Sequence, residues 1–349
     1  MSENNRKSAP VRPVRVAFVG LGERGRSALR LLIPVEGAEV VALCDLSADS
    51  LRAVRSLQPE VADARCFAGP EAYKELCLQP DVDLVYICSD WTSHPLIAIE
   101  AMRCRKDVAI EVPAATTMEE IRQLVSTQQQ TQRRCFLLEN ACFERQTMDA
   151  VAAIRRGELG EIVHAEGNYY HCLDERWARW RLEANRRRRG DLYPTHELGP
   201  ICQALDIGRS DELQTLVCMD SAPFTGPILY KERTGVEASD FQNGDHTTTL
   251  IRTRRGRTIV LRHDVLTPQP YDRRLLFIGT RGRLELCDAG RPSHDEMTLQ
   301  MNRHLIRSLL HHVPFGIDIR DLATWCSVIP LSEESIRRGF APVNFPNIL

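Results

Sequence analysis

Three glycines near the N-terminus have the type and spacing expected of a dinucleotide-binding turn. Gly20, Gly22 and Gly25 follow residues 15–19 (RVAFV), an apolar run typical of a buried strand, and precede a segment with helical spacing. In such a turn the first glycine permits the tight bend, the second lets the backbone approach a pyrophosphate, and the third lets helix and strand pack closely. The new helix would offer free N–H groups and the positive end of its dipole to the phosphates.

Asp45 indicates which dinucleotide binds. It ends a second strand-like run, residues 38–44 (AEVVALC), twenty positions after Gly25. A carboxylate at that place can accept hydrogen bonds from both ribose hydroxyls of NAD, and it repels the additional phosphate of NADP. The other interpretation is a strand-end aspartate that caps the following helix. We predict NAD as the cofactor.

The elements that must position these residues alternate regularly. Strands are predicted at 81–89, 107–111 and 135–139, and helices at 96–102 and 117–130. This alternation predicts a doubly wound parallel sheet, with its ligand at the carboxyl ends of the strands. Four polar or aromatic residues follow such ends and are expected to share one rim of the cofactor cleft: Trp91, His94, Glu111 and Asn140.

From about residue 143 the pattern changes. A helix at 148–156 precedes strand-like segments that include 246–253, 256–266 and 274–286, separated by turn residues. We therefore predict an N-terminal Rossmann domain (15–142) and a C-terminal α+β domain with a largely antiparallel open sheet (143–349), after a flexible tail (1–14). The second domain is expected to bind substrate. We expect its open face to be apolar and broad, which favours a homodimer or higher homo-oligomer.

Composition narrows the class of protein. The formal net charge is −2, so nothing points to nucleic acid as a partner, and no apolar run is long enough to cross a membrane. The polar N-terminus does not have the pattern of a secretory signal. The twelve cysteines form no CxxC pair and lie mostly in apolar runs, so we expect buried, reduced thiols, no metal site and a cytoplasmic protein. The arginine run 186–189 is expected to be a solvated face, the alternative being contact with an anionic substrate.

At this point the chain resembles the Gfo/Idh/MocA oxidoreductase family over nearly its full length. In that family a Glu-Lys-Pro tripeptide closes the strand before the catalytic cleft, and its lysine assists hydride transfer. Here the tripeptide is Glu111-Val112-Pro113. Valine cannot hold, donate or relay a proton, so the usual family mechanism loses its central residue.

Further motifs resemble one branch, glycoside hydrolase family 109. They are EVPAA (111–115), GDLYPTHELGP (190–200), NGD (243–245), RHD (262–264), PY (270–271) and the late IDIRDLATW and IPLSEESI. The resemblance implies an α-N-acetylgalactosaminidase that keeps its NAD. It also implies a mechanism in which a sugar is oxidised at C3, loses its C1 substituent by elimination, gains water and is reduced by the same cofactor.

The resemblance also assigns residues. The catalytic tyrosine falls on Tyr169 and the catalytic histidine on His196, with tyrosine and histidine able to supply acid–base groups. Sugar-contacting positions fall on Arg181, Tyr193, Pro194, Thr195 and Tyr271. NAD-contacting positions fall on Gly20, Gly22, Glu23, Arg24, Gly25, Asp45, Trp91, Thr92, Ser93, His94, Glu111, Val112 and Asn140.

Two departures lie beside the expected sugar site. The family pattern Tyr-x-His-Asp-Leu-Arg reads YYHCLD here, with Cys172 in place of the Asp, and the glycine that usually follows the histidine is Glu197. These changes leave the identity of the sugar open. The alternatives to a glycosidase are an NAD-dependent sugar or cyclitol dehydrogenase, with His196 as base, and a non-catalytic NAD-bound sensor. From the residues alone, Tyr169 could be an ordinary strand residue and His196 a helix-start cap.

Overall fold

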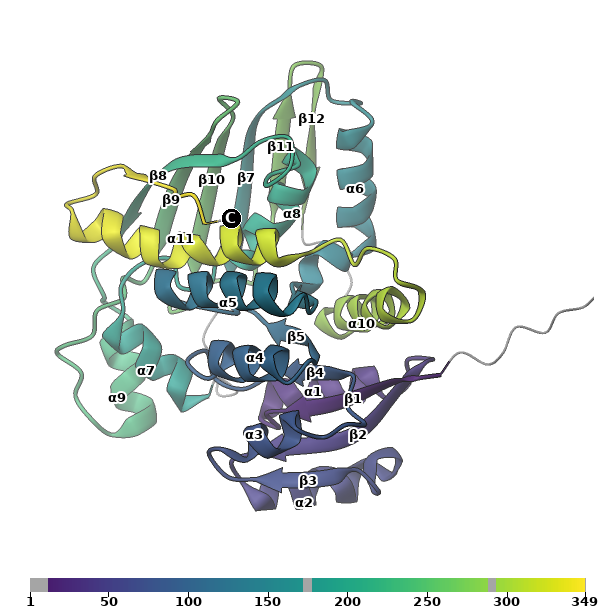
Figure 1. Cartoon of the computed structure of the whole chain (residues 1–349). Helices are drawn as coiled ribbons and strands as arrows, with labels where there is room; N and C mark the ends of the chain where they lie inside the picture. The colour runs from purple at the N-terminus through teal and green to yellow at the C-terminus, as the bar shows by residue number, and fades with distance from the viewer. Residues whose placement is uncertain (1–11, 172–177, 288–292, 349) are drawn as a thin grey trace, which may run out of the picture.

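Residues 12–171, 178–287 and 293–348 are described by a computed structural model, and they form two β-sheets with helices packed between and around them (Figure 1). The first sheet has six parallel strands in the order β3-β2-β1-β4-β5-β6. This order, with crossover helices between consecutive strands, is the doubly wound Rossmann arrangement that the alternating sequence pattern predicts. The prediction of a parallel N-terminal sheet is therefore confirmed.

Four strands of this sheet, β1, β4, β5 and β6, are almost wholly buried, as strands covered on both faces must be, whereas β2 and β3 at one edge are only partly buried. The six strands are β1 (Val14–Val19), β2 (Ala38–Asp45), β3 (Arg65–Ala68), β4 (Leu84–Ile87), β5 (Asp107–Glu111) and β6 (Cys135–Leu138). The helical segments between and after them are α1 (Glu23–Leu32), α2 (Ala48–Leu57), the 3-10 turn η1 (Pro59–Val61), α3 (Ala72–Cys77), α4 (His94–Arg103), α5 (Met118–Thr131) and the 3-10 turn η2 (Asn140–Phe143).

The second sheet has seven strands in the order β12-β11-β7-β10-β9-β8-β13. All neighbouring pairs are antiparallel except β7 and β10, which run parallel. Its strands are β7 (Ile162–Tyr170), β8 (Leu213–Asp220), β9 (Thr247–Thr253), β10 (Thr258–Asp264), β11 (Leu275–Gly279), β12 (Gly282–Leu286) and β13 (Val343–Asn344). The helices of this part of the chain are α6 (Arg145–Arg155), α7 (Arg179–Arg187), α8 (Thr195–Leu205), α9 (Gly226–Thr234), α10 (His294–His311) and α11 (Ile319–Arg337).

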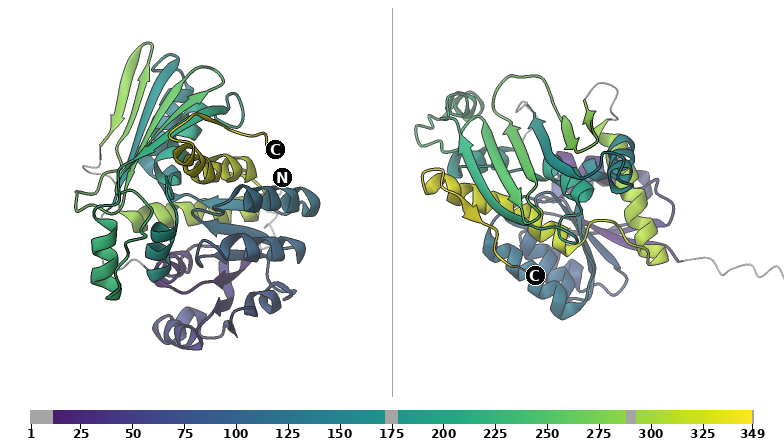
Figure 2. Two further views of the ribbon diagram at one scale, coloured as in Figure 1. Left: turned by 90° about the vertical axis from the view of Figure 1, so that its left-hand side faces the viewer. Right: turned by 90° about the horizontal axis from the view of Figure 1, so that it is seen from above.

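The last two helices connect the sheets. Helix α11 lies between the second sheet and α5, packing on β8 on one side and on α5 on the other, while α10 packs against α1 and η2 (Figures 1 and 2). One hydrophobic core runs continuously through both parts, with Phe18 under the first sheet and Trp325 on α11 both fully buried. The C-terminal helices thereby hold the substrate side of the molecule against the Rossmann sheet.

The face of the second sheet opposite α8 and α11 is less apolar than the sequence suggested. Met219, Leu250 and Ile278 are exposed there. Across β10, β7 and β11, however, Glu166 forms ion pairs with Arg262 at 2.7 Å and with Arg274 at 3.2 Å. The expected broad apolar face therefore also carries charged side chains, which are Glu166 on β7, Arg262 on β10 and Arg274 just before β11.

The described cysteines are all free thiols, and of these Cys66 and Cys287 are the exposed ones. Burial and free thiols agree with the prediction of small apolar side chains rather than disulfides. None of the helices in the part of the chain that the structure describes is both long and apolar enough to span a membrane.

Candidate active site

A cavity of ≈ 840 Å³ lies between the carboxyl ends of the Rossmann strands and the second sheet. From the Rossmann side it is lined by the glycine turn, Asp45, Trp91, His94, Glu111, Val112 and Asn140. From the other side it is lined by Tyr169, His171, Trp180, Arg181, Tyr193, His196, Tyr271 and Arg273. The four strand-end residues that were predicted to share one rim all line this cavity. Its size and its mixture of apolar walls with a few polar groups are typical of a cofactor and substrate site.

The glycine turn has the geometry that a dinucleotide needs. Gly20 has a φ of +90°, and a Cβ atom on it would lie 2.6 Å from the backbone of Cys88 and Ser89. A Cβ on Gly25 would lie 1.9 Å from the carbonyl oxygen of Gly20, so this position requires glycine for helix and strand to pack. A Cβ on Gly22 would meet nothing within 4 Å, because this residue borders the cavity itself. The backbone here is open to a pyrophosphate.

Asp45 contacts the same turn. Its carboxylate accepts hydrogen bonds from the backbone N–H of Leu21 at 2.7 Å and of Ser47 at 2.9 Å. The first bond holds the turn to the end of β2. The second closes a local turn before α2, whose N-cap is Ser47, so Asp45 does not cap that helix. Both are compatible with a carboxylate that faces the cavity and accepts ribose hydroxyls.

The Glu111 carboxylate is held by an ion pair deep in the cleft. The guanidinium of Arg24 donates to its Oε1 through Nε at 3.0 Å and through Nη2 at 2.5 Å. Burial lowers the pKa of Arg24, but the Glu111 carboxylate outweighs that effect and keeps the pKa above its ordinary value. Val112, the next residue, lines the cavity and is buried. The position where a lysine would work in the wider family therefore carries no group that can move a proton.

Asn140 connects the cofactor side to α10. Its Nδ2 donates to Thr298 Oγ1 at 3.0 Å and lies 3.1 Å from His294 Nε2. Its Oδ1 is buried and has no hydrogen-bond partner among the described residues. A buried amide oxygen beside the cavity can accept a hydrogen bond from a bound cofactor, which would satisfy it. The residues on this side thus fit NAD.

The substrate side is a cluster of aromatic rings around His196. The ring centroid of Tyr169 lies 4.8 Å from that of His196, and Tyr193 lies 5.0 Å from it, both edge to face. Tyr271 lies 6.3 Å from Tyr169. Burial, with the neighbouring Tyr271 and Tyr193 hydroxyls, raises the pKa of Tyr169 well above its ordinary value, so its phenol stays protonated. The cluster offers sugar-stacking faces together with proton donors and acceptors.

Arg181 lies among three rings from both sides of the cavity. Its guanidinium carbon is 5.4 Å from the centroid of Trp91, 5.3 Å from that of Trp180 and 5.4 Å from that of Tyr193. Cation–π contacts of this kind fix an arginine without neutralising it. Because Trp91 belongs to the Rossmann side and Trp180 to α7, this stack also joins the two sides.

His196 is bound from behind by a carboxylate. Its Nδ1 lies 2.5 Å from Oε1 of Glu139, and both side chains are buried. Glu139 lies between the end of β6 and Asn140, and it was not among the residues predicted from the sequence. Its place at the carboxyl end of a parallel strand is the feature that could have identified it.

Two further carboxyl groups lie buried behind this cluster. Burial raises the pKa of Asp191 to about 7. Burial, and then the neighbouring Asp191, raises the pKa of Glu197 well above its ordinary value. Glu197 does not line the cavity, and a Cβ atom on Gly167 would lie 2.8 Å from its Cβ, so its side chain packs against β7. The carboxyl group that departs from the family pattern therefore lies behind Tyr169 and His196 rather than in the cavity.

Three of the predicted contact residues lie outside the cavity wall, and Cys172 lies outside the described residues. Thr92 is exposed and turns toward Asp90, while Pro194 and Thr195 are buried at the start of α8. The cavity is also lined by residues that were not predicted from the sequence: Trp180, His171, Arg273 and the start of α10 (residues 293–295). No local pattern marks the start of α10, because the chain returns to the cleft only after the whole second sheet.

The arginine run is structural. Arg186 pairs with Asp240 at 2.9 Å, Arg188 with Glu333 at 2.7 Å and Arg189 with Asp220 at 2.7 Å. The run therefore ties α7 and the residues after it to their surroundings instead of forming the solvated face that was predicted, although Arg187 is 77% exposed. Within the described ranges no cluster of three histidine, cysteine or acidic side chains could hold a metal ion.

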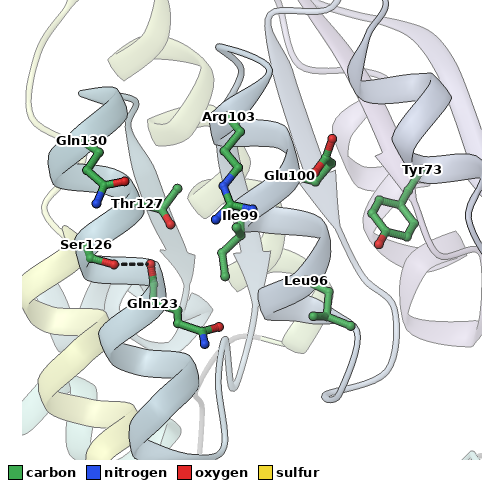
Figure 3. Close-up of a pocket in the computed structure, with 9 residues that line it drawn as sticks. All are labelled: Tyr73, Leu96, Ile99, Glu100, Arg103, Gln123, Ser126, Thr127 and Gln130. Carbon is green, nitrogen blue, oxygen red and sulfur yellow. Dashed lines mark hydrogen bonds between the residues drawn. The ribbon is translucent and has the colours of Figure 1, made fainter.

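A second hollow of ≈ 400 Å³ lies on the outer side of the Rossmann sheet, lined from α3, α4 and α5 (Figure 3). The Ser126 hydroxyl donates to the backbone oxygen of Gln123, and the remaining side chains along it, such as Glu100 and Arg103, come from helix faces (Figure 3). It contains none of the residues predicted for the site.

Comparison with known proteins agrees with this geometry. Residues 14–138 match the oxidoreductase family with an NAD-binding Rossmann fold, and residues 174–290 match the C-terminal domain of glycosyl hydrolase 109. Among solved structures, a probable dehydrogenase from Thermotoga maritima has a TM-score of 0.79 at 16% identity, covering 96% of this chain and 100% of that one. Myo-inositol dehydrogenase from Lactobacillus casei, in complex with NAD(H) and myo-inositol, has a TM-score of 0.76 at 17% identity, covering 96% and 99%.

Fold and cofactor cleft together define an NAD-binding protein of the oxidoreductase class. Curated relatives narrow this further. A glycosyl hydrolase family 109 protein from Porphyromonas gingivalis is 36% identical over 96% of this chain and 84% of its own length. Glycosyl hydrolase family 109 protein 1 from Bacteroides fragilis is 35% identical over 96% and 85%. The chain belongs to glycosyl hydrolase family 109.

Proposed function

We propose that the protein is a glycosidase with retained NAD, which oxidises a bound sugar transiently at C3, eliminates the C1 substituent, adds water and reduces the ring again. One observation carries this proposal. Val112 leaves the cofactor side of the cavity without the proton-carrying side chain of a dehydrogenase, while Tyr169 and His196 face the same cavity from the opposite side. Membership of family 109 supports it.

The cofactor side of the site would hold the dinucleotide. The glycine turn would take the pyrophosphate, Asp45 the ribose hydroxyls, and Glu111 and Asn140 would border the nicotinamide end. When bound, NAD supplies a hydride acceptor for C3 and returns the hydride at the end of the cycle. Because the cofactor is regenerated within each turnover, a buried and closely lined site is an advantage.

The proton steps fall to the aromatic cluster. His196 accepts the proton that the C3 hydroxyl releases, passes it to solvent, and then accepts the proton from C2, which the new ketone makes acidic. Tyr169, protonated because burial raises its pKa, donates to the C1 oxygen as the bond to C1 breaks. In the second half water takes the place of the leaving group and loses its proton to Tyr169. His196 returns a proton to C2, takes another from solvent and gives it to the C3 oxygen.

The experiment that tests this proposal uses aryl α- and β-glycosides in D₂O without added NAD. We expect aryl release together with deuterium at C2, because the C2 proton leaves and returns in every turnover. Release without exchange, or no release over a broad panel of sugars, would contradict the proposal. Accumulation of NADH with free sugars or cyclitols and added NAD would instead establish the dehydrogenase alternative.

We also propose that copies of the chain pair through the open face of the second sheet. The exposed Met219 and Leu250 would form the apolar part of the contact, and the Glu166 ion pairs its rim. Light scattering of the wild type and of a Met219→Lys, Leu250→Lys variant tests this. A dimer that becomes monomeric supports it, and an unchanged mass contradicts it.

A further inference from the structure

Glu139 makes an unusual contact for a residue outside the cavity wall. It directly follows β6, its side chain is completely buried, and its Oε1 lies 2.5 Å from Nδ1 of His196 on α8. The same oxygen accepts the backbone N–H of Ala141 at 3.1 Å. Oε2 has no partner among the described residues. The carboxylate thus accepts hydrogen bonds from two donors, and one of them is the imidazole of His196, which lines the cavity.

The contact depends on a close approach of α8 to the Rossmann sheet. A Cβ atom on Gly199, one turn after His196, would lie 3.1 Å from Cγ of Glu139 and 3.0 Å from the ring of Trp325. Any larger residue there would press α8 away from β6. Gly199 therefore permits the distance over which the carboxylate reaches the histidine.

The chemistry of the pair sets the tautomer of the imidazole. A carboxylate can only accept, so Nδ1 of His196 carries the shared hydrogen. Nε2, at the opposite edge of the ring, is then the nitrogen that can accept a proton from the cavity. When it does, the positive imidazolium has the Glu139 charge directly behind it, in surroundings where charges are poorly screened.

We infer that Glu139 is a positioning residue for His196, which fixes the Nδ1–H tautomer and stabilises the imidazolium during proton transfer. Glu139 does not line the cavity and would act only through His196. The inference rests on the proposed function for its effect on turnover, whereas the tautomer itself can be observed without any reaction. A purely structural role is the competing explanation, because Glu139 also caps η2 through Ala141.

The test compares Glu139→Leu, which removes the acceptor, and Glu139→Gln, which keeps an acceptor for Ala141 but removes the charge. The matched control is Glu197→Gln, which alters a buried carboxyl next to His196 that makes no hydrogen bond to the imidazole. Two properties are measured on the NAD-loaded proteins: the kcat and KM for glycoside turnover, and the ¹⁵N resonances of His196, assigned by comparison with His196→Ala.

We expect Nδ1–H in the wild type and in the control, and its loss in Glu139→Leu. We expect kcat to fall by about 10²- to 10⁴-fold in Glu139→Leu and by at least about tenfold in Glu139→Gln, with KM and bound NAD unchanged. If Glu139→Leu does not fold, Glu139→Gln decides: kcat equal to that of the control overturns the inference. Equal losses in all three variants, or a wild-type imidazole protonated at Nε2, would overturn it as well.

The two proposals fail in distinguishable ways. A wild type that shows Nδ1–H but hydrolyses no glycoside contradicts the proposed function and leaves the tautomer result standing. A wild type that hydrolyses glycosides while Glu139→Leu keeps full kcat contradicts the positioning role alone.

Discussion

The cofactor side of the cavity takes its side chains from neighbouring strand ends, whereas the substrate side gathers them from segments scattered between Tyr169 and Arg273. On the cofactor side the shape of the site is set by the backbone: two glycine positions have no room for a Cβ atom, and Asp45 accepts a hydrogen bond from the turn itself. On the substrate side the shape of the site is set by side chains, because aromatic rings and buried carboxyl groups pack around His196. The first kind of site tolerates few backbone changes, and the second can exchange side chains while the fold stays intact.

The largest effect that separates the two sides is expected from His196→Ala. Turnover should fall by about 10²- to 10⁴-fold, the usual contribution of a general acid–base residue, while NAD stays bound because no cofactor-side contact is lost. Turnover of an aryl glycoside and the NAD content after gel filtration measure the two properties. His311→Ala, at the exposed end of α10, is the control. Loss of NAD in parallel with turnover would show that the sides are not independent.

The complementary variant is Asp45→Ala. Removing a charged acceptor costs about 1.5–3 kcal/mol, so NAD affinity should fall by about 10- to 150-fold, and the preference for NAD over NADP should narrow. With NAD saturating, kcat should be unchanged. Titration of cofactor-stripped protein with both dinucleotides measures this, with the exposed Asp49→Asn as control. An unchanged NAD affinity would assign Asp45 only to the turn and to the following helix.

The sequence predicts the cofactor side of the site better than the substrate side. Gly20, Gly25 and Asp45 could be placed because their roles depend on a strand–turn–helix unit that is contiguous in the chain. The rim at Trp91 and Asn140 followed from the rule that parallel strands end at one edge. Both depend on local backbone geometry, which sequence patterns report directly.

The substrate side could be placed only through family resemblance. Contacts such as Glu139 to His196, or Arg181 among three rings, join segments far apart in the chain, and no spacing encodes them. The open sheet face was predicted to be apolar. The alternation along a strand shows which residues share a face, but it does not show which outward side chains on neighbouring strands form ion pairs. Glu166 with Arg262 is such a pair.

A smaller effect is expected from Glu197→Gln on stability. Burial raises the pKa of Glu197 in the folded protein above the unfolded value, so the folded state keeps its proton while the unfolded state loses it as the pH rises. The wild type therefore loses stability above about pH 4.5, by at most about 1.4 kcal/mol per pH unit, until the folded group ionises. The glutamine variant lacks this loss.

Thermal unfolding from pH 5 to 8 measures this difference. The melting temperature of Glu197→Gln minus that of the wild type should increase with pH, whatever constant offset the buried amide introduces. Because the pKa of Glu197 depends on Asp191, the substitution also changes the titration of Asp191, and the difference in melting temperature reports both buried carboxyl groups. Parallel curves would mean that Glu197 is ionised when folded, and the substrate side would then contain a buried charge rather than a neutral acid.

The smallest effect concerns the arginine run, which lies beside the substrate side without belonging to it. Arg186 donates to both carboxylate oxygens of Asp240 and to the Tyr230 hydroxyl at 2.9 Å, and so holds α7 against α9. Since α7 carries Trp180 and Arg181 into the cavity, Arg186→Ala should raise KM by at most about fivefold, with kcat and NAD binding unchanged. Arg187 is 77% exposed and lies 3.6 Å from Glu183, so Arg187→Ala should change neither. Equal effects of the two variants on KM would mean that the positive charge of the run, rather than the position of α7, affects substrate binding. The run would then be part of the site.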